Sequence, residues 1–283
     1  MHAWQPFTPR GVAAFAHASG ARLFLVQCIV AALTAFTTVW FVARHWAPVV
    51  TDAIQALPGE SVIQYGRWTT TNGDPQLLAG NRYLEIILDA RDAGGVSGAA
   101  DLSTVVTVPG LQICGVLGCL DLPYETGETI KVSRNELAPW WDAWRQPVEA
   151  LIGITIIFAL LISWWLLGIV AAPIVKLVAF FTDRRVTWSG SWRMGNAALL
   201  PGAFIVIFGV VLYAFGAIDP LRLALFYALH LVCDLVFVCT SPFFLPKINS
   251  LQWGGNPFST PPAAIHLERT PKAKQHNPFR GEG

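Results

Sequence analysis

The sequence predicts a membrane protein of the all-α class, a four-helix bundle with a small, mainly β extracytoplasmic domain inserted between the first and second spans. Hydrophobic residues make up 54% of the 283 residues and charged residues only 13%, well below the roughly 25% that is usual for soluble domains. Four apolar runs are long enough to cross a bilayer. The segment between the first two runs has the composition of short strands and turns instead.

The four spans are expected at residues 22–44, 146–172, 197–217 and 221–245. About 20 helical residues, rising roughly 1.5 Å each, cover the hydrocarbon core of a bilayer. The first run is too long for the core of a signal peptide, and no cleavage site with paired small residues follows it, so we expect it to be retained. Pro201 and Gly202 lie near the start of the third run, where a missing amide hydrogen bond costs least.

The distribution of lysine and arginine predicts the orientation of the spans. In the loop 173–196 and the tail 246–283, basic residues outnumber acidic ones; they are Lys176, Arg184, Arg185, Arg193, Lys247, Arg269, Lys272, Lys274 and Arg280. Residues 44–145 instead contain seven basic and twelve acidic residues. Because basic loops stay in the cytoplasm, both termini are expected there. The segment 45–145 is then expected outside a cell membrane, which we assign to the bacterial inner membrane.

Five short strands are expected in the outer domain, because five stretches are β-branched or aromatic and are bounded by turn residues. They are residues 61–65, 82–89, 102–108, 111–116 and 129–132. After them, Ser133 and Glu136 have the spacing of a capping box, which predicts a helix leading into the second span. Trp140, Trp141 and Trp144 on that helix are expected to form an interfacial belt.

The two ends of the chain have different predicted structures. The N-terminal segment 1–21 is expected in the cytoplasm, and its residues 6–20 are expected to form a short interfacial helix. The tail 246–283 is rich in Pro, Gly and polar residues and is expected to be disordered. It contains Asn-Pro-Phe at 256–258 and again at 277–279. In a eukaryote this repeat suggests docking to endocytic adaptor domains; we favour the simpler interpretation of turn-forming Asn-Pro in a disordered tail.

Cys114 and Cys119 lie in the outer domain and are separated by Gly-Val-Leu-Gly. In an oxidising compartment this pair is expected to close a tight loop by a disulfide. A metal site requires further Cys or His ligands, and the outer segment offers only His45 at its edge. A catalytic redox pair usually has two intervening residues rather than four. We therefore expect neither a metal nor a cofactor in the outer domain.

A polar stripe follows one face of the fourth span, since its members recur at helical spacing. The stripe is Tyr227, His230, Asp234 and Ser241, and the first span offers the candidate partners Gln27, Thr34 and Thr38 on a matching face. A charged residue inside a membrane costs at least about 2.5 to 3.5 kcal/mol and needs a partner, which His230, four residues before Asp234, can supply. Because the two polar faces match, we expect spans one and four to pack through them. The stripe then serves either as hydrogen bonding between helices or as a proton or ion relay through His230 and Asp234; a metal site is a third alternative.

Common catalytic motifs are absent from the sequence. It contains no Walker-type loop, no dinucleotide-binding glycine motif, no Gly-x-Ser-x-Gly and no His-Glu-x-x-His. Glu85, Asp89 and Asp92 are expected on the solvated face of a strand and turn rather than as an acid–base pair. The formal net charge is only +1, so no basic field recruits nucleic acid. We therefore expect neither an enzyme nor a nucleic-acid-binding protein.

The order of parts resembles an uncharacterised family of bacterial integral membrane proteins, known only as a domain of unknown function. The resemblance covers about residues 5–245 and is carried by Phe7-Thr8-Pro9-Arg10, Tyr65-Gly66-Arg67 and Ile86-Ile87-Leu88-Asp89. The stretch 188–201, ending in Ala-Leu-Leu-Pro, is similar to Yip-type membrane proteins. Four spans differ from the five of some members, and the cysteine pair is outside the family pattern. The resemblance implies an outer insert after the first span and no known activity.

Two functions are compatible with these patterns. The first is a non-enzymatic scaffold, sensor or partner-binding protein, which acts through its outer domain and has the lipid bilayer and another protein as partners. The alternative is an ion- or proton-coupled transport component that uses His230 and Asp234. A transporter should have a polar cavity that reaches Asp234, whereas a scaffold should have that residue sealed between helices. The sequence names no small-molecule ligand.

Overall fold

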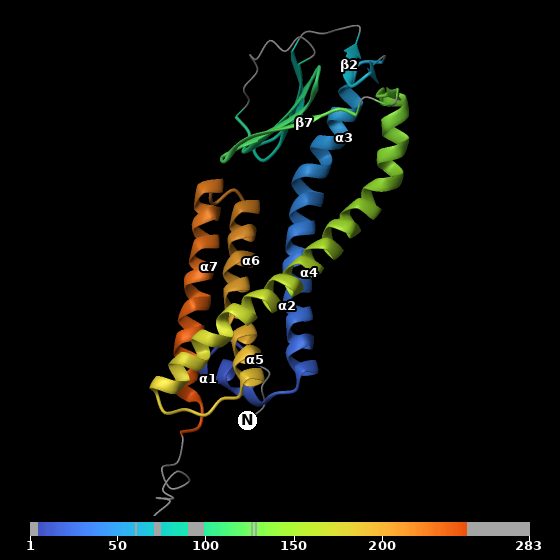
Figure 1. Cartoon of the computed structure of the whole chain (residues 1–283). Coiled ribbons are helices and arrows are strands. Elements are labelled where there is room, and N and C mark those ends of the chain that lie inside the picture. Colours follow the sequence, from blue (N-terminus) through green and yellow to red (C-terminus); the bar gives the residue numbers. More distant parts are fainter. Residues whose placement is uncertain are drawn as a thin grey trace, which may run out of the picture. The chain divides into compact units, whose positions relative to one another are not determined.

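The computed structural model describes residues 5–59, 61–70, 75–89, 99–125, 127 and 129–247. Four of its helical segments are long and apolar enough to cross a membrane (Figure 1), which confirms the four long apolar helices predicted from the sequence. The segments are Gly20–Ala56, Arg134–Phe181, Trp188–Ala214 and Pro220–Phe244. The predicted tail and its two Asn-Pro-Phe repeats lie outside the described residues.

The first long segment is a chain of helices rather than a single one. The α-helix α2 (Gly20–Phe41) passes into a π-helical turn, η2 (Val42–Trp46), and then into α3 (Ala47–Ala56). Pro48 lies in the first turn of α3, where its missing amide removes a hydrogen bond that the π turn accommodates. The helical segment therefore continues to Ala56, beyond Arg44, where the first span was predicted to end.

The second long segment, α4 (Arg134–Phe181), is one helix of 48 residues. The predicted helix that leads from Ser133 into the second span is therefore confirmed, but its capping box is not. Ser133 is the N-cap residue and its side chain makes no capping hydrogen bond; its backbone carbonyl accepts from the amides of Glu136 and Leu137 at 3.1 and 2.9 Å. On the same helix, the Trp141 indole donates to Thr51 of α3 at 2.9 Å, so one of the predicted belt tryptophans joins two helices.

The remaining helices are α5 (Trp188–Ala198), α6 (Leu200–Ala214), α7 (Pro220–Thr240) and the 3-10 turn η3 (Ser241–Phe244). The sequence predicted a loop over residues 173–196, but α4 extends to Phe181 and α5 begins at Trp188, so two helices occupy most of it. Thr187 caps α5 by accepting from the amide of Gly190 at 3.0 Å. Met194, Ala197 and Ala198 are fully buried, so an apolar face among polar residues stabilises this helix.

The N-terminal segment is also part of the helical core. The short helix α1 (Pro9–Ala14) and the 3-10 turn η1 (Phe15–His17) place Val12 and Phe15 at full burial. They belong to the same hydrophobic cluster as Leu23, Met194 and Leu200. The predicted helix therefore exists, but its apolar face packs on the protein itself.

The strands form two sheets between α3 and α4 in the sequence. A five-stranded sheet has the order β3-β4-β5-β6-β7 and a three-stranded sheet has the order β2-β1-β8; β4 and β5 are parallel and the other pairs are antiparallel. The strands are β1 (Ser61–Gln64), β2 (Arg67–Thr70), β3 (Gln76–Gly80), β4 (Glu85–Asp89), β5 (Leu102–Thr107), β6 (Gly110–Gly115), β7 (Gly118–Pro123) and β8 (Ile130–Lys131). All five predicted strands are present; β2, β3 and β7 were missed.

The β3–β4 turn is joined to the turn between α6 and α7. The Arg82 guanidinium donates to the carbonyls of Gly216 and Ile218 at 2.7 and 3.0 Å. The Tyr83 hydroxyl lies within hydrogen-bond distance of the last carbonyls of α6, those of Tyr213 and Ala214, at 3.0 and 2.8 Å. Tyr83 thus binds the carbonyl end of α6, and Arg82 binds the turn that follows this helix.

Candidate functional site

The polar residues of α7 do not form the predicted His–Asp pair. The ring of His230 turns back along its own helix, where Nδ1 meets the carbonyl of Tyr227 and the ring lies 4.5 Å from the ring of Tyr227. Tyr227 itself is 60% exposed. Among the described residues, His230 and Asp234 make no ion pair with each other.

Asp234 is buried against α6. Its carboxyl lies beside Gly202, where an added Cβ would come within 2.8 Å of the Asp234 Cγ and 2.9 Å of the His230 carbonyl oxygen. Gly202 stands in the first turn of α6, whose amides lack intrahelical partners and attract negative charge. Asp234 is only 6% exposed, and within the described structure its Oδ1 has no hydrogen-bond partner. Glycine at 202 is therefore what allows α7 to place a carboxyl at this helix start.

Ser241, the last member of the stripe, is fully buried at the start of η3. Its hydroxyl likewise has no hydrogen-bond partner among the described residues. The helical spacing predicted that all four residues face the interior. The structure buries Asp234 and Ser241 but neither His230 nor Tyr227.

The prediction that spans one and four pack through their polar faces is wrong. Helix α2 packs mainly against α4 and α6, and α7 packs mainly against α6. Thr34 and Thr38 donate to carbonyls of their own helix, those of Val30 and Thr34, both at 3.0 Å, as threonines inside helices often do. A helical period identifies the residues that share a face, but not the helix that covers this face.

Gln27 has partners on α5 and α4 instead. Its amide nitrogen donates to Asn196 Oδ1 at 3.1 Å, and its Oε1 accepts from the Trp165 indole at 3.2 Å. Asn196 also donates to the carbonyl of Trp192 at 2.9 Å. Gly168 of α4 leaves room for the Asn196 amide, since a Cβ there would lie 2.6 Å from its Cγ. This buried amide network joins three helices, and the sequence analysis missed Asn196 because it was assigned to a loop.

Two of the three acidic residues expected on a solvated face are buried. Glu85 is 4% exposed and Asp89 is 5% exposed, while Asp92 lies outside the described residues. Strand β4, which carries both, is an inner strand of the five-stranded sheet. In the described part of the chain, no group of three or more His, Cys, Asp or Glu side chains is arranged to hold a metal ion.

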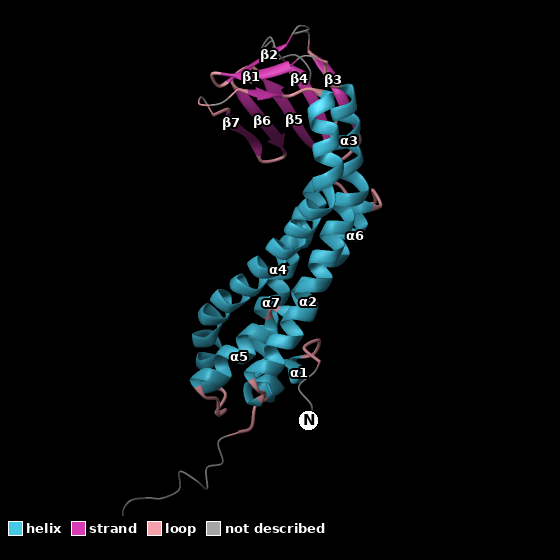
Figure 2. Cartoon of the chain, turned by 90° about the vertical axis from the view of Figure 1, so that its right-hand side faces the viewer, coloured by secondary structure: helices cyan, strands magenta, loops and turns pink. Residues whose placement is uncertain are grey.

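The two edges of the five-stranded sheet differ. Strand β3 packs against α3, whereas β7, among the strands that the structure describes, pairs with β6 alone (Figure 2). All six residues of β7 are exposed. An open edge presents backbone amides and carbonyls that can pair with another chain.

The register of β6 and β7 identifies which backbone groups are free. Cys114 and Cys119 face each other and are joined by a disulfide, with their Cα atoms 4.0 Å apart. That short separation is typical of a pair without backbone hydrogen bonds, and such pairs alternate with hydrogen-bonded ones. Asp121, opposite Gln112, is therefore also a non-hydrogen-bonded position. The amides and carbonyls of Cys119 and Asp121 point away from β6, toward the open side.

One face of this edge is apolar. Leu120 and Leu122 lie opposite Ile113 and Leu111 on β6, and they are 59% and 43% exposed. The turn that connects the strands places Leu117 fully in solvent. An exposed apolar stripe beside unpaired backbone groups is the arrangement that strand-adding partners use, in which main-chain bonds give affinity and side-chain contacts give specificity.

Comparison of the chain with protein-family models, with curated proteins and with solved structures found no match. The resemblance to a bacterial membrane family and to Yip-type proteins therefore stays a prediction.

Proposed function

We propose that this is a polytopic membrane protein without enzymatic activity, whose outer domain binds a protein partner at the open edge of strand β7. Both termini lie in the cytoplasm in this proposal, and the domain faces the extracytoplasmic side. The single observation that carries it is the fully exposed strand β7, with Leu120 and Leu122 beside unpaired backbone groups. The partner adds an extended segment as a sixth strand.

The disulfide supports this role. It joins β6 to β7 next to the turn, so the edge strand is held to its neighbour even though no further strand covers it. A rigid edge lowers the ordering cost of binding. A disulfide also persists in an oxidising compartment, in agreement with an outer location.

The transport alternative has less support. Asp234 is sealed between α6 and α7 with 6% exposure, and His230 is turned toward Tyr227 rather than toward the carboxyl. A carboxyl that is sealed against the start of α6, whose free amides attract negative charge, favours a structural role for this residue.

The test compares two substitutions of Asp121. Asp121→Pro removes an outward amide without breaking the ladder to β6, and proline is tolerated on edge strands for that reason. Asp121→Ala is the matched control, because both variants lose the hydrogen bond from Gln112 at 2.9 Å but only the proline variant loses the amide. Each full-length variant is crosslinked in native membranes and its partners are identified by mass spectrometry.

We expect a partner crosslinked by the wild type and by Asp121→Ala, and reduced about tenfold or more with Asp121→Pro, as the loss of a backbone hydrogen bond and a steric block predict. A partner that both variants retain equally would contradict binding at the β7 edge. A partner lost equally from both would assign binding to the Asp121 side chain instead.

A further inference from the structure

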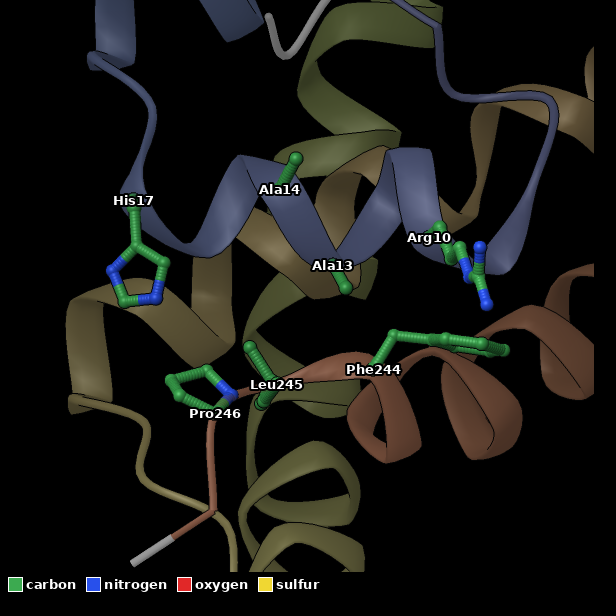
Figure 3. Close-up of a pocket in the computed structure, with 7 residues that line it drawn as sticks. All are labelled: Arg10, Ala13, Ala14, His17, Phe244, Leu245 and Pro246. Carbon is green, nitrogen blue, oxygen red and sulfur yellow. The ribbon is translucent and has the colours of Figure 1, made fainter. Parts of the chain in front are cut away.

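A cavity lies between the N-terminal helix and the end of the last helix. A cavity of about 360 Å³ opens there, lined by Arg10, Ala13, Ala14, His17, Phe244, Leu245 and Pro246. Figure 3 shows Arg10 and His17 at the two ends of the wall formed by α1 and η1, with the segment 244–246 as the opposite wall. The two walls come from opposite ends of the described chain and enclose one cavity.

The cavity has positive charge and no carboxylate in its lining. The Arg10 guanidinium lies 5.4 Å from the centre of the Phe244 ring, and within the described residues Arg10 forms no ion pair. Its five N–H donors are therefore available to a ligand, and a guanidinium matches the geometry of a phosphate.

Further arginines hold the two walls in place. Arg193 donates to the carbonyls of Ala18 and Ala16 at 2.7 and 3.2 Å, on either side of His17. Arg184 donates to the carbonyl of Leu245, and the backbone amide of Arg185 donates to the carbonyl of Pro246 at 3.2 Å. The side chains of Arg193 and Arg184 and the backbone of Arg185 thus hold the walls together, and the three arginines add positive potential around the cavity.

Apart from Arg10 and His17 the lining is apolar, and aromatic rings close to it in the sequence are exposed. Phe243 and Phe244 are 50% and 47% exposed, and Phe7 is 55% exposed and packs edge-on against Phe204 at 5.1 Å. A soluble anion needs no such surface, whereas a lipid brings acyl chains together with its phosphate. The combination of one free guanidinium, an apolar lining and neighbouring exposed rings fits a lipid headgroup at a membrane surface.

We propose that this cavity binds the phosphate headgroup of an anionic membrane lipid, with Arg10 as the main phosphate ligand. The N-terminal helix and the turn η3 are thereby fixed at the cytoplasmic face of the bilayer in the proposed topology. This site is independent of the β7 edge and of its partner.

The test measures lipid binding by native mass spectrometry of the full chain in detergent, titrated with dioleoyl phosphatidylglycerol or with dioleoyl phosphatidylcholine. We expect the wild type to prefer the anionic lipid, and Arg10→Gln to lose that preference about tenfold, in line with the loss of a charge-assisted hydrogen bond. Arg222→Gln is the matched control, since Arg222 is an exposed arginine beside Asp219, outside this cavity, and it should bind like the wild type.

A second variant keeps all the charge. Ala14→Phe fills the cavity with an apolar ring and should also abolish the preference, which keeps the test valid where Arg10→Gln fails to fold. Equal binding of phosphatidylglycerol by the wild type, Arg10→Gln and Ala14→Phe would refute the site. Displacement of the lipid by millimolar inorganic phosphate would refute a lipid occupant and assign the cavity to a soluble anion.

Discussion

The contact between Gly202 and Asp234 rests on the absence of a single carbon atom. Glycine has no Cβ, and here that lets the α7 carboxyl approach the start of α6. The negative charge is then placed against amides that the first turn of a helix leaves unpaired. The same absence makes position 202 intolerant of any larger residue.

Gly202→Ala should destabilise the protein by about 1 to 3 kcal/mol, because the added methyl group overpacks the contact with Asp234. The free energy of unfolding is measured by titrating the purified protein in mixed micelles with SDS and monitoring its helix content by circular dichroism. Gly20→Ala is the control, since a Cβ at Gly20 meets nothing within 4 Å, and it should be neutral or slightly stabilising. Equal SDS midpoints of unfolding for the two variants would show that α6 and α7 can move apart at Gly202 without a loss of stability, against this prediction.

The amide network around Gln27 gives a second prediction at this scale. Gln27→Ala and Asn196→Ala should each lower stability. In a double-mutant cycle their coupling should be about 0.6 kcal/mol, the usual value for a hydrogen bond between membrane helices. The same SDS titration provides the four stabilities. Strictly additive effects would mean that the 3.1 Å contact between these side chains contributes nothing.

The candidate site residues were only partly predictable from the sequence. Gln27 and Asp234 stand out because a polar residue in an apolar run is costly and has to face inward. Their partners, Asn196 and Gly202, could not be assigned to them. Neighbouring helices in a bundle are chosen by packing across the whole interface, and no periodic pattern in one helix encodes that choice.

At the scale of elements, the turn between α6 and α7 depends on a distant turn of the sheet. From the β3–β4 turn, Tyr83 reaches the last carbonyls of α6 and Arg82 donates to two carbonyls of the turn after it. Tyr213 adds a bond in the opposite direction, since its hydroxyl donates to Asp101 at 2.8 Å. The rings of Tyr83 and Tyr213 are also in edge contact, 5.0 Å apart.

Arg82→Gln should loosen this turn, because both bonds from the guanidinium to Gly216 and Ile218 are lost. We expect the backbone amides of residues 215–218 to exchange hydrogen about tenfold faster, a change of about 1.4 kcal/mol in local opening. Hydrogen–deuterium exchange with mass spectrometry measures this. Arg67→Gln, which changes an exposed arginine on β2, is the control and should leave the exchange of these peptides unchanged. If Arg82→Gln also leaves it unchanged, Arg82 does not stabilise the turn.

Elements with a strong periodic or compositional pattern were predictable, and elements defined by their neighbours were not. The four long helices and five strands follow from apolar runs and β-branched clusters. Strand β7 was missed because its sequence, Gly-Cys-Leu-Asp-Leu-Pro, has few β-branched residues, and its place is fixed by pairing with β6. Helix α5 was missed because many of its residues are polar or glycine, and its short apolar face is recognised only once the helix is seen to pack against α4.

For the whole molecule, two proposed binding regions lie at separate places in the chain: the β7 edge in the sheet region and the Arg10 cavity where α1 meets η3. Basic residues accompany the cavity and acidic residues are in excess in the sheet region. This asymmetry of charge is the property that sets the orientation of membrane proteins during insertion. In the proposed topology, one chain would reach an anionic lipid of the cytoplasmic leaflet and a partner outside the cell membrane at the same time.

This orientation gives the last prediction. A phosphatase that is active only outside the cytoplasm, inserted at Gly127 between β7 and β8 of the full chain, should be active in a bacterial host. The same insertion after Asp183, in the basic loop between α4 and α5, should be inactive. Gly127 is exposed and a Cβ there meets nothing within 4 Å, so the insertion should be tolerated.

Phosphatase activity only in the fusion after Asp183 would mean that the topology is the reverse of the proposed one. It would also place the Cys114–Cys119 disulfide in a reducing compartment, where it should be lost, and alkylation of the two thiols without prior reduction would detect this.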